Sequence, residues 1–306
     1  MKGVMTGFLL IFVFIFIIGC QGGTGGTEGT GTFTGGANGL TIAFVELSPP
    51  KTFDEGNIVP VKVILKNKGE YDLAAGETKA RIYGVNLDNF GLGKEYKSTS
   101  GPLRGVGEFN AEGGQGEIDF GNAQYALPVI NSEEFVLRGR VCYPYQTRML
   151  SEVCIANAAN VDSATCSLDG EKIKKGDVSS GPIQVSSLKE QTRGSKLVRF
   201  DLVIDNKGGG EVYNPSVNCE QLDEEVFKRS NINKVGLQVV NPVNAKCDFK
   251  DKEASDSGVL ELANGKASIS CWIEVNDEPY TERLSLKLDY FYRDDTSTNI
   301  RIFEKN

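Results

Sequence analysis

At residues 284–292 the chain contains the stretch Leu284-Ser285-Leu286-Lys287-Leu288-Asp289-Tyr290-Phe291-Tyr292, in which apolar and polar side chains alternate. In an extended chain the leucines and the two tyrosines lie on one face, and Ser285, Lys287 and Asp289 lie on the other. Such alternation is typical of an antiparallel β-strand that has its apolar face in the core and its polar face in water. The stretch therefore predicts a half-buried β-strand.

The chain carries an earlier copy of this stretch. Residues 137–145 match residues 284–292, and both copies end in Tyr-x-Tyr. Another pair of segments, residues 61–69 and 200–208, each predicts a strand that enters an Asn-Lys-Gly turn. Internal repetition of this kind indicates two units of one architecture. The inward side chains expected in the first unit are Phe135, Leu137, Val141, Tyr143 and Tyr145, which places Cys142 on the outward face.

Strand patterns separated by turn residues recur through residues 40–303, and helical periodicity is nearly absent. Asn264-Gly265 is a favoured hairpin turn, and Leu222–Arg229 is the one expected helix. Many short strands with glycine-rich turns indicate a sandwich or a barrel. We therefore predict an all-β fold of two tandem immunoglobulin-like antiparallel β-sandwiches, at residues 40–165 and 183–306. Residues 166–182 are the expected linker between them.

The N-terminus has the pattern of an export signal. Lys2 is followed by an apolar run from Phe8 to Ile18, and then by Gly19-Cys20. The run is shorter than the roughly twenty apolar residues of a membrane-spanning helix, and it suits a cleaved signal peptide at residues 1–19. Ile17-Ile18-Gly19-Cys20 looks like a lipobox, which predicts a lipid on Cys20. The alternative is an uncleaved anchor helix from Val4 to Cys20.

Residues 20–39 are expected to be the lipidated cysteine and a flexible linker. The segment Gln21–Gly39 is dominated by glycine and threonine, and Phe33 is its one large apolar residue. Such a segment buries too little apolar surface to offset the entropy of ordering its backbone. It therefore predicts a tether between the membrane and the globular body.

Six cysteines are left for disulfides, which suit an exported protein. Cys142 and Cys154 flank a stretch that resembles a hairpin, so we expect them to pair across it. Cys247 and Cys271 lie in alternating segments that suit neighbouring strands. Cys166 and Cys219 then pair by elimination.

Several of these features together resemble a known family. They are the Ser48-Pro49-Pro50 break, Glu55-Gly56, and the valine-rich strand that ends in Asn67-Lys68-Gly69. This arrangement looks like the CARDB (cell adhesion related domain) modules of prokaryotic cell surfaces. The Cys142–Tyr145 and Lys287–Tyr290 segments are also similar to exported archaeal proteins with paired domains. The resemblance implies an immunoglobulin-like fold for residues 40–306 and brings no catalytic residues with it.

Composition narrows the possible chemistry. The chain of 306 residues has no histidine, which excludes Ser-His-Asp and Cys-His catalysis and zinc sites that use histidine. The formal net charge of −8 argues against nucleic acid as a partner. We therefore expect a protein that is not an enzyme and has no cofactor. A calcium ion is the one exception, in an oxygen-rich loop at Asp248, Asp251, Glu253 and Asp256.

Trp272 is the candidate ligand-binding residue, because alternation places it opposite the apolar residues of its strand. Burial under a loop or the other domain is the alternative. We expect a lipid-anchored protein on the outer face of the cell membrane that serves as a binding, adhesion or envelope-structural module for a protein or glycan partner. One alternative is a subunit that self-assembles into a filament or coat through edge strands. The other is a carbohydrate-binding or enzyme-accessory protein.

Overall fold

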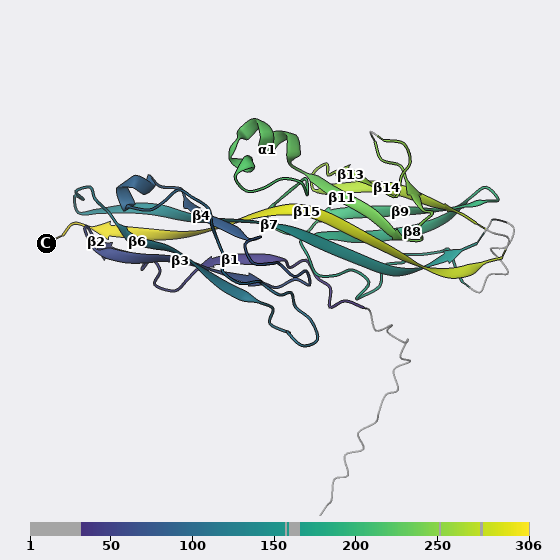
Figure 1. Cartoon of the computed structure of the whole chain (residues 1–306), viewed down its shortest axis with the longest axis horizontal. Helices are drawn as coiled ribbons and strands as arrows, with labels where there is room; N and C mark the ends of the chain where they lie inside the picture. The colour runs from purple at the N-terminus through teal and green to yellow at the C-terminus, as the bar shows by residue number, and fades with distance from the viewer. Residues whose placement is uncertain (1–31, 157, 159–165, 251, 276–277, 306) are drawn as a thin grey trace, which may run out of the picture.

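A computed structural model describes residues 32–306 apart from residues 157, 159–165, 251, 276–277 and 306 (Figure 1). The predicted signal peptide, the lipidation site Cys20 and most of the predicted tether lie outside the described residues. Within the described part the chain is mainly antiparallel β-structure, which confirms the all-β prediction.

The described chain is made mainly of strands, with few helical turns between them. In chain order the elements are β1 (Leu40–Phe44), β2 (Thr52–Asp54), β3 (Ile58–Asn67), β4 (Lys79–Tyr83), η1 (Leu87–Phe90), β5 (Lys97–Ser98), β6 (Gln115–Gln124), β7 (Ser132–Ile155), β8 (Ile183–Arg193), β9 (Leu197–Asn206), β10 (Glu211–Tyr213), η3 (Gln221–Asp223), α1 (Glu225–Asn231), β11 (Lys234–Asn241), β12 (Lys246–Cys247), β13 (Ser257–Glu261), β14 (Lys266–Glu274) and β15 (Tyr280–Phe303). The expected helix is present as η3 followed by α1.

Two strands of 24 residues each, β7 and β15, run the length of the molecule. They pair antiparallel along their whole length, from Ser132 opposite Phe303 to Ile155 opposite Tyr280. We call this pair the central ribbon. It contains both copies of the alternating stretch, and it lies in the middle of an eight-stranded sheet whose main path is β13-β11-β15-β7-β4-β5.

Two smaller sheets complete two lobes on this shared sheet. The β1-β3-β6 sheet lies in the first lobe, where Tyr143 donates a hydrogen bond to the carbonyl of Leu40. The β12-β14-β9-β8 sheet lies in the second lobe, where Thr147 donates to the carbonyl of Ile183. Figure 1 shows the two sheets one after the other along the ribbon, with β3 and β6 in one half and β8, β9 and β14 in the other. The interior side chains of both lobes form one continuous apolar core.

The lobes exchange strands. The first part of β7 pairs with β4 of the first lobe, and the rest of β7 continues into the second lobe. The first part of β15 pairs with β11 of the second lobe, and its end pairs with β2 of the first lobe. The first lobe therefore contains the end of β15, which comes from the second half of the sequence. The second lobe contains the end of β7, which comes from the first half. The predicted tandem units share a sheet, which the repeat pattern alone does not reveal.

A cluster of tyrosines marks the centre of the exchange. Tyr143 lies opposite Tyr292, and Tyr145 lies opposite Tyr290, on either side of the Pro144–Phe291 pair. Tyr145 donates to Oδ1 of Asn67 at 3.2 Å, and Tyr292 donates to Oδ1 of Asn206 at 3.1 Å. These two asparagines begin the repeated Asn-Lys-Gly turns. The repeats in the sequence are therefore two halves of one junction related by an approximate twofold axis.

The expected linker, residues 166–182, is attached to the ribbon in its second half. Leu150 donates its backbone N–H to the carbonyl of Asp177, and Ser179 donates to the carbonyl of Arg148. These bonds extend the sheet beyond β7. The segment therefore packs along the second lobe and does not form a free hinge.

Candidate interaction surfaces

The end of the predicted tether is bound to the body. The carboxylate of Glu70 accepts hydrogen bonds from the backbone N–H groups of Thr34 at 2.8 Å, Gly35 at 3.1 Å and Ser180 at 2.6 Å. Phe33 donates to the carbonyl of Gly176 at 2.9 Å. The prediction of a free tether up to Gly39 is therefore wrong for residues 32–39. Composition missed this contact because a distant carboxylate, rather than apolar burial, holds the segment.

This attachment lies at the junction of the two lobes. Glu70 directly follows the Asn67-Lys68-Gly69 turn of the first lobe, and Ser180 lies just before β8 of the second lobe. Gly35 and Gly36 have positive φ angles of 76° and 117°, so the path of the segment through the junction depends on glycine. The described chain thus begins near the middle of an elongated body (Figure 1).

The structure pairs Cys142 with Cys219, Cys154 with Cys166, and Cys247 with Cys271. The last pair is the expected one. The expected Cys142–Cys154 and Cys166–Cys219 bridges are wrong. Both Cys142 and Cys154 lie on β7, and the extended strand between them separates them by about 40 Å. The stretch between these two cysteines is continuous ribbon rather than a hairpin, with Pro144 opposite Phe291.

The outward face of the ribbon at Cys142 is covered. Residues 214–232, which we call the strap, cross this face and carry Cys219. Cys142 is fully buried in a second apolar cluster that also contains Tyr213, Val217, Leu222 and Phe291. The sequence places Cys142 on the outward face and gives no sign that the strap buries it, because alternation identifies the two faces of a strand but not what covers them.

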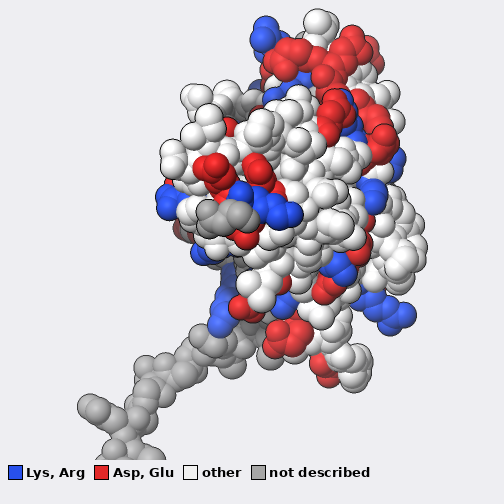
Figure 2. Space-filling view, turned by 90° about the vertical axis from the view of Figure 1, so that its left-hand side faces the viewer, with Lys and Arg blue, Asp and Glu red and all other residues white. Residues whose placement is uncertain are grey.

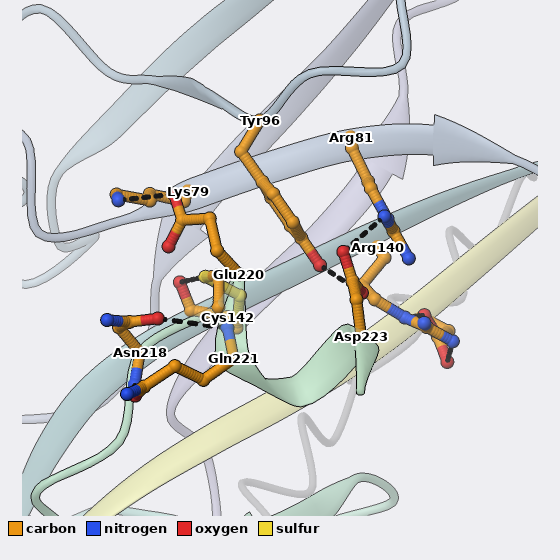
Figure 3. Close-up of a disulfide and its surroundings, with 11 residues drawn as sticks. Lys79, Arg81, Tyr96, Arg140, Cys142, Asn218, Glu220, Gln221 and Asp223 are labelled. Atoms are coloured by element: carbon orange, nitrogen blue, oxygen red, sulfur yellow. Dashed lines mark hydrogen bonds and ion pairs between the residues drawn. A yellow bond between two sulfur atoms is a disulfide. The ribbon is translucent and has the colours of Figure 1, made fainter. Parts of the chain in front are cut away.

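Ion pairs bind the strap to the first lobe (Figure 3). Lys79 contacts Glu220 at 2.6 Å, and Arg81 contacts Asp223 at 2.6 Å. Tyr96 donates to Asp223 at 3.3 Å, and the Arg81 guanidinium lies 4.8 Å from the centre of its ring. Burial raises the pKa of Tyr96 to about 12, so its hydroxyl stays protonated as a donor at neutral pH. Acidic side chains are also gathered on the side of the molecule that carries α1 (Figure 2).

A buried carboxylate supports the far end of the second lobe. The side chain of Glu190 has no exposed surface; it accepts from the Cys154 backbone N–H at 2.9 Å and lies 3.3 Å from Nζ of Lys172. Burial raises the pKa of Glu190 to about 7, although Lys172 and the Cys154 N–H oppose the shift. This group was not singled out from the sequence, because alternation on β8 gives no sign of a charged residue facing inward.

The raised pKa of Glu190 predicts how stability changes with pH. Between about pH 4.5 and 7 the folded chain binds this proton more tightly than the unfolded chain does, so the free energy of unfolding falls as the pH rises. The expected loss is about 1–3 kcal/mol and is complete above pH 7. Urea unfolding at several pH values should show this slope for the parent and not for Glu190→Gln. The exposed control Glu225→Gln keeps the slope; equal slopes in all three proteins would contradict the prediction.

The predicted calcium loop does not form a cluster in the described residues. Asp248, Glu253 and Asp256 are exposed, and Asp251 lies outside the described part. No group of three or more acidic or cysteine side chains in the described ranges is arranged to hold a metal ion.

Trp272 lies on the outward face of the β12-β14-β9-β8 sheet and is half-buried. Its strand neighbours are Lys246 of β12 and Arg199 of β9. Its alternation with buried Cys271 and Ile273 follows the sequence pattern. The partial burial of Trp272 fits the long side chains on either side of it in the sheet.

Comparisons with known proteins give no family assignment. No protein-family model and no curated protein match the chain, so the likeness to CARDB modules stays a resemblance. A secreted serine protease, VesC of Vibrio cholerae, is 7% identical over 85% of this chain, with a TM-score of 0.19; the chain spans 51% of that protein. The collagen adhesin of S. aureus is 9% identical over 91% of this chain and 96% of its own, with a TM-score of 0.13. Likenesses as weak as these two do not identify a function.

The disulfides and the helices bear on where the protein is located. Three disulfides in a mainly β chain are features of an extracellular protein. Among the helices of the described residues, none has the length and apolar character to cross a membrane.

Proposed function

We propose that this protein is anchored to the outer face of the cell membrane by a lipid on Cys20 and serves there as a non-enzymatic binding or adhesion module. The observation that carries the proposal is the central ribbon, whose two paired strands run continuously through both lobes. A force that slides the lobes apart along the ribbon has to break many inter-strand hydrogen bonds at once. Such a construction suits a part that bears load, and the disulfides suit an oxidising environment.

The attachment at the junction sets the geometry of this proposed role. The described chain begins at Thr32, twelve positions after Cys20, and a fully extended segment of this length spans about 40 Å. The body is then held near its middle, close to the membrane, with both ends available to partners. A protein held at one end would instead extend away from the surface.

A single substitution tests the anchor. We expect the parent chain in the membrane fraction, with a mature N-terminus at a lipid-modified Cys20 by mass spectrometry. Cys20→Ser should abolish the modification and the membrane attachment, because serine has no thiol for the thioether bond. Thr30→Ser, in the same segment, should leave both unchanged. An unprocessed parent chain in the cytosol with reduced thiols would overturn the proposal.

Two sheet edges, β8 and β6, weigh against the filament alternative. At β8 the backbone N–H of Lys172 donates to the carbonyl of Leu188, which covers that edge. At β6 the register with β3 shifts near Pro60, and Lys97 donates its Nζ–H to the carbonyl of Asp119. Covered and irregular edges are the features by which β-proteins avoid pairing with other chains. We therefore expect a monomer in size-exclusion chromatography with light scattering; ordered polymers would favour the filament function instead.

A further inference from the structure

The outward face around Trp272 carries an ordered row of side chains. Strand register places Lys246, Trp272, Arg199 and Gln191 next to one another across β12, β14, β9 and β8. The adjacent row contains Asp248, Ser270, Asp201 and Lys189. Neighbouring strands are about 4.8 Å apart, so the first row brings the Trp272 indole beside the Arg199 guanidinium.

Asp201 holds this face in one arrangement. Its carboxylate accepts hydrogen bonds from Nε of Arg199 at 2.8 Å, from Oγ of Ser270 at 2.7 Å and from the amide of Gln191. Burial alone would raise the pKa of Asp201, but these three donors lower it below its ordinary value. The ionised carboxylate fixes the plane of the Arg199 guanidinium beside Trp272. Polar groups held in place before binding lose little entropy when a ligand arrives.

Cations outnumber carboxylates by one on this face, although the chain is acidic overall: it carries Lys189, Arg193, Arg199 and Lys246 together with Asp201, Asp248 and Glu274. Asp201 and Arg199 neutralise each other as an ion pair, with Nη2 of Arg199 at 2.7 Å. Within the part of the chain that the structure describes, Lys189 and Lys246 have no ion-pair partner. Lys246 lies on β12 at one side of the two rows, and Lys189 lies on β8 at the other side. An anionic ligand that lies across the strands can therefore contact a cation at each side.

The face continues into a groove. A cavity of about 500 Å³ opens between β13 and β14, and its polar walls are Asp248, Lys250, Glu261, Lys266 and Ser268. Ser268, Ser270 and Trp272 are alternate residues of β14 and project on the same side of the sheet. From Trp272 to Ser268 the strand rises by about 13 Å. This length suits a short oligosaccharide rather than a single sugar.

We propose that this face, from Trp272 to the groove at Ser268, binds an acidic oligosaccharide. The indole stacks on a sugar ring, Lys246 and Lys189 bind the carboxylate or sulfate groups of the ligand, and Ser270 and Gln191 contact ring hydroxyls. The inference rests on the proposed binding role and names the class of partner. The outward residues beside Trp272 are mainly polar, whereas the centre of a protein–protein interface is usually apolar. A glycan therefore fits the face better than a protein does.

Trp272 itself reports binding, because it is the only tryptophan in the chain. The purified chain is first applied to an array of acidic and neutral oligosaccharides, and the retained glycan is then titrated while Trp272 fluorescence is recorded. We expect retention of uronate-bearing or sulfated glycans, a saturable fluorescence change and at least a roughly tenfold weaker affinity in about 0.5 M salt than in about 0.05 M salt. Neutral analogues of the same length should bind at least about tenfold more weakly.

Variants locate the site. Trp272→Ala should abolish binding measured by calorimetry, and Lys246→Gln should weaken it at least about fivefold with no change in the melting temperature. Lys175→Gln is the matched control, since Lys175 is exposed beside the N-terminal attachment, and it should bind like the parent. The proposal is overturned if no acidic glycan is retained, if neutral glycans bind equally well, or if Lys246→Gln leaves affinity unchanged. The assay uses purified protein, so its failure is distinguishable from failure of the lipid anchor.

Discussion

Leu65→Ala, a change in the first lobe, lowers the denaturant concentration at which Trp272 in the second lobe unfolds. Leu65 is fully buried, and removing its side chain is expected to cost about 2–5 kcal/mol. Each lobe contains half of the ribbon strand that comes from the other, so neither can unfold while the other keeps its sheet. Trp272 fluorescence should therefore follow the loss of stability in the first lobe.

A reciprocal variant and a control complete this experiment. Leu202→Ala, also fully buried, should shift the transition in the second lobe by a similar amount, and circular dichroism should give the same midpoint as fluorescence for each protein. Leu47 is 71% exposed, so Leu47→Ala should change the midpoint little. A Trp272 transition that ignores Leu65→Ala, while circular dichroism reports earlier unfolding, would show that the lobes fold independently.

The second large effect concerns the strap. Replacing Cys142 and Cys219 together by alanine is expected to cost about 2–5 kcal/mol, because the bridge closes a loop with a sequence separation of 77 in the unfolded chain. The double variant also removes the buried covalent bond that joins the strap to β7. The ion pairs of Lys79 and Arg81 are partly exposed and contribute little alone. Urea unfolding measures the loss, and limited proteolysis should cut the strap first.

The bridge between Cys154 and Cys166 provides the comparison. Its sequence separation is only 12, so it restricts the unfolded chain less than the Cys142–Cys219 bridge does. Removing it should therefore lower the free energy of unfolding by a smaller amount and leave the strap protected from proteolysis. Equal losses for both double variants, with no new cleavage in residues 214–232, would contradict the role assigned to the Cys142–Cys219 bridge.

Local pattern was sufficient for part of the structure. The alternation of residues 284–292 and its earlier copy identified both ribbon strands and the side that carries the tyrosines. The turn at Asn264-Gly265 has positive φ at both residues, as such a turn requires. Trp272 faces outward because the period of two is strict on β14. These features depend on neighbours in sequence, which a pattern can detect.

The features that the sequence did not predict depend on distant partners. The stretch between Cys142 and Cys154 suggests a hairpin, yet it is continuous ribbon paired with β15, and this error misassigns two disulfides. The partner of Cys142 is set by the strap, which is 77 residues away in sequence. Glu70 gives no local sign that it will bind Thr34 and Gly35. A carboxylate that accepts backbone hydrogen bonds looks, in the sequence, like any other surface residue.

The approximate symmetry of the ribbon has a consequence for the origin of the protein. Two separate copies of one half, each with a long final strand, would build the same body as a homodimer whose subunits swap those strands. Duplication and fusion of such a gene would join both halves in one polypeptide. Afterwards the halves would be free to diverge. The strap and the tryptophan face, each present in one lobe only, have the character of such later additions.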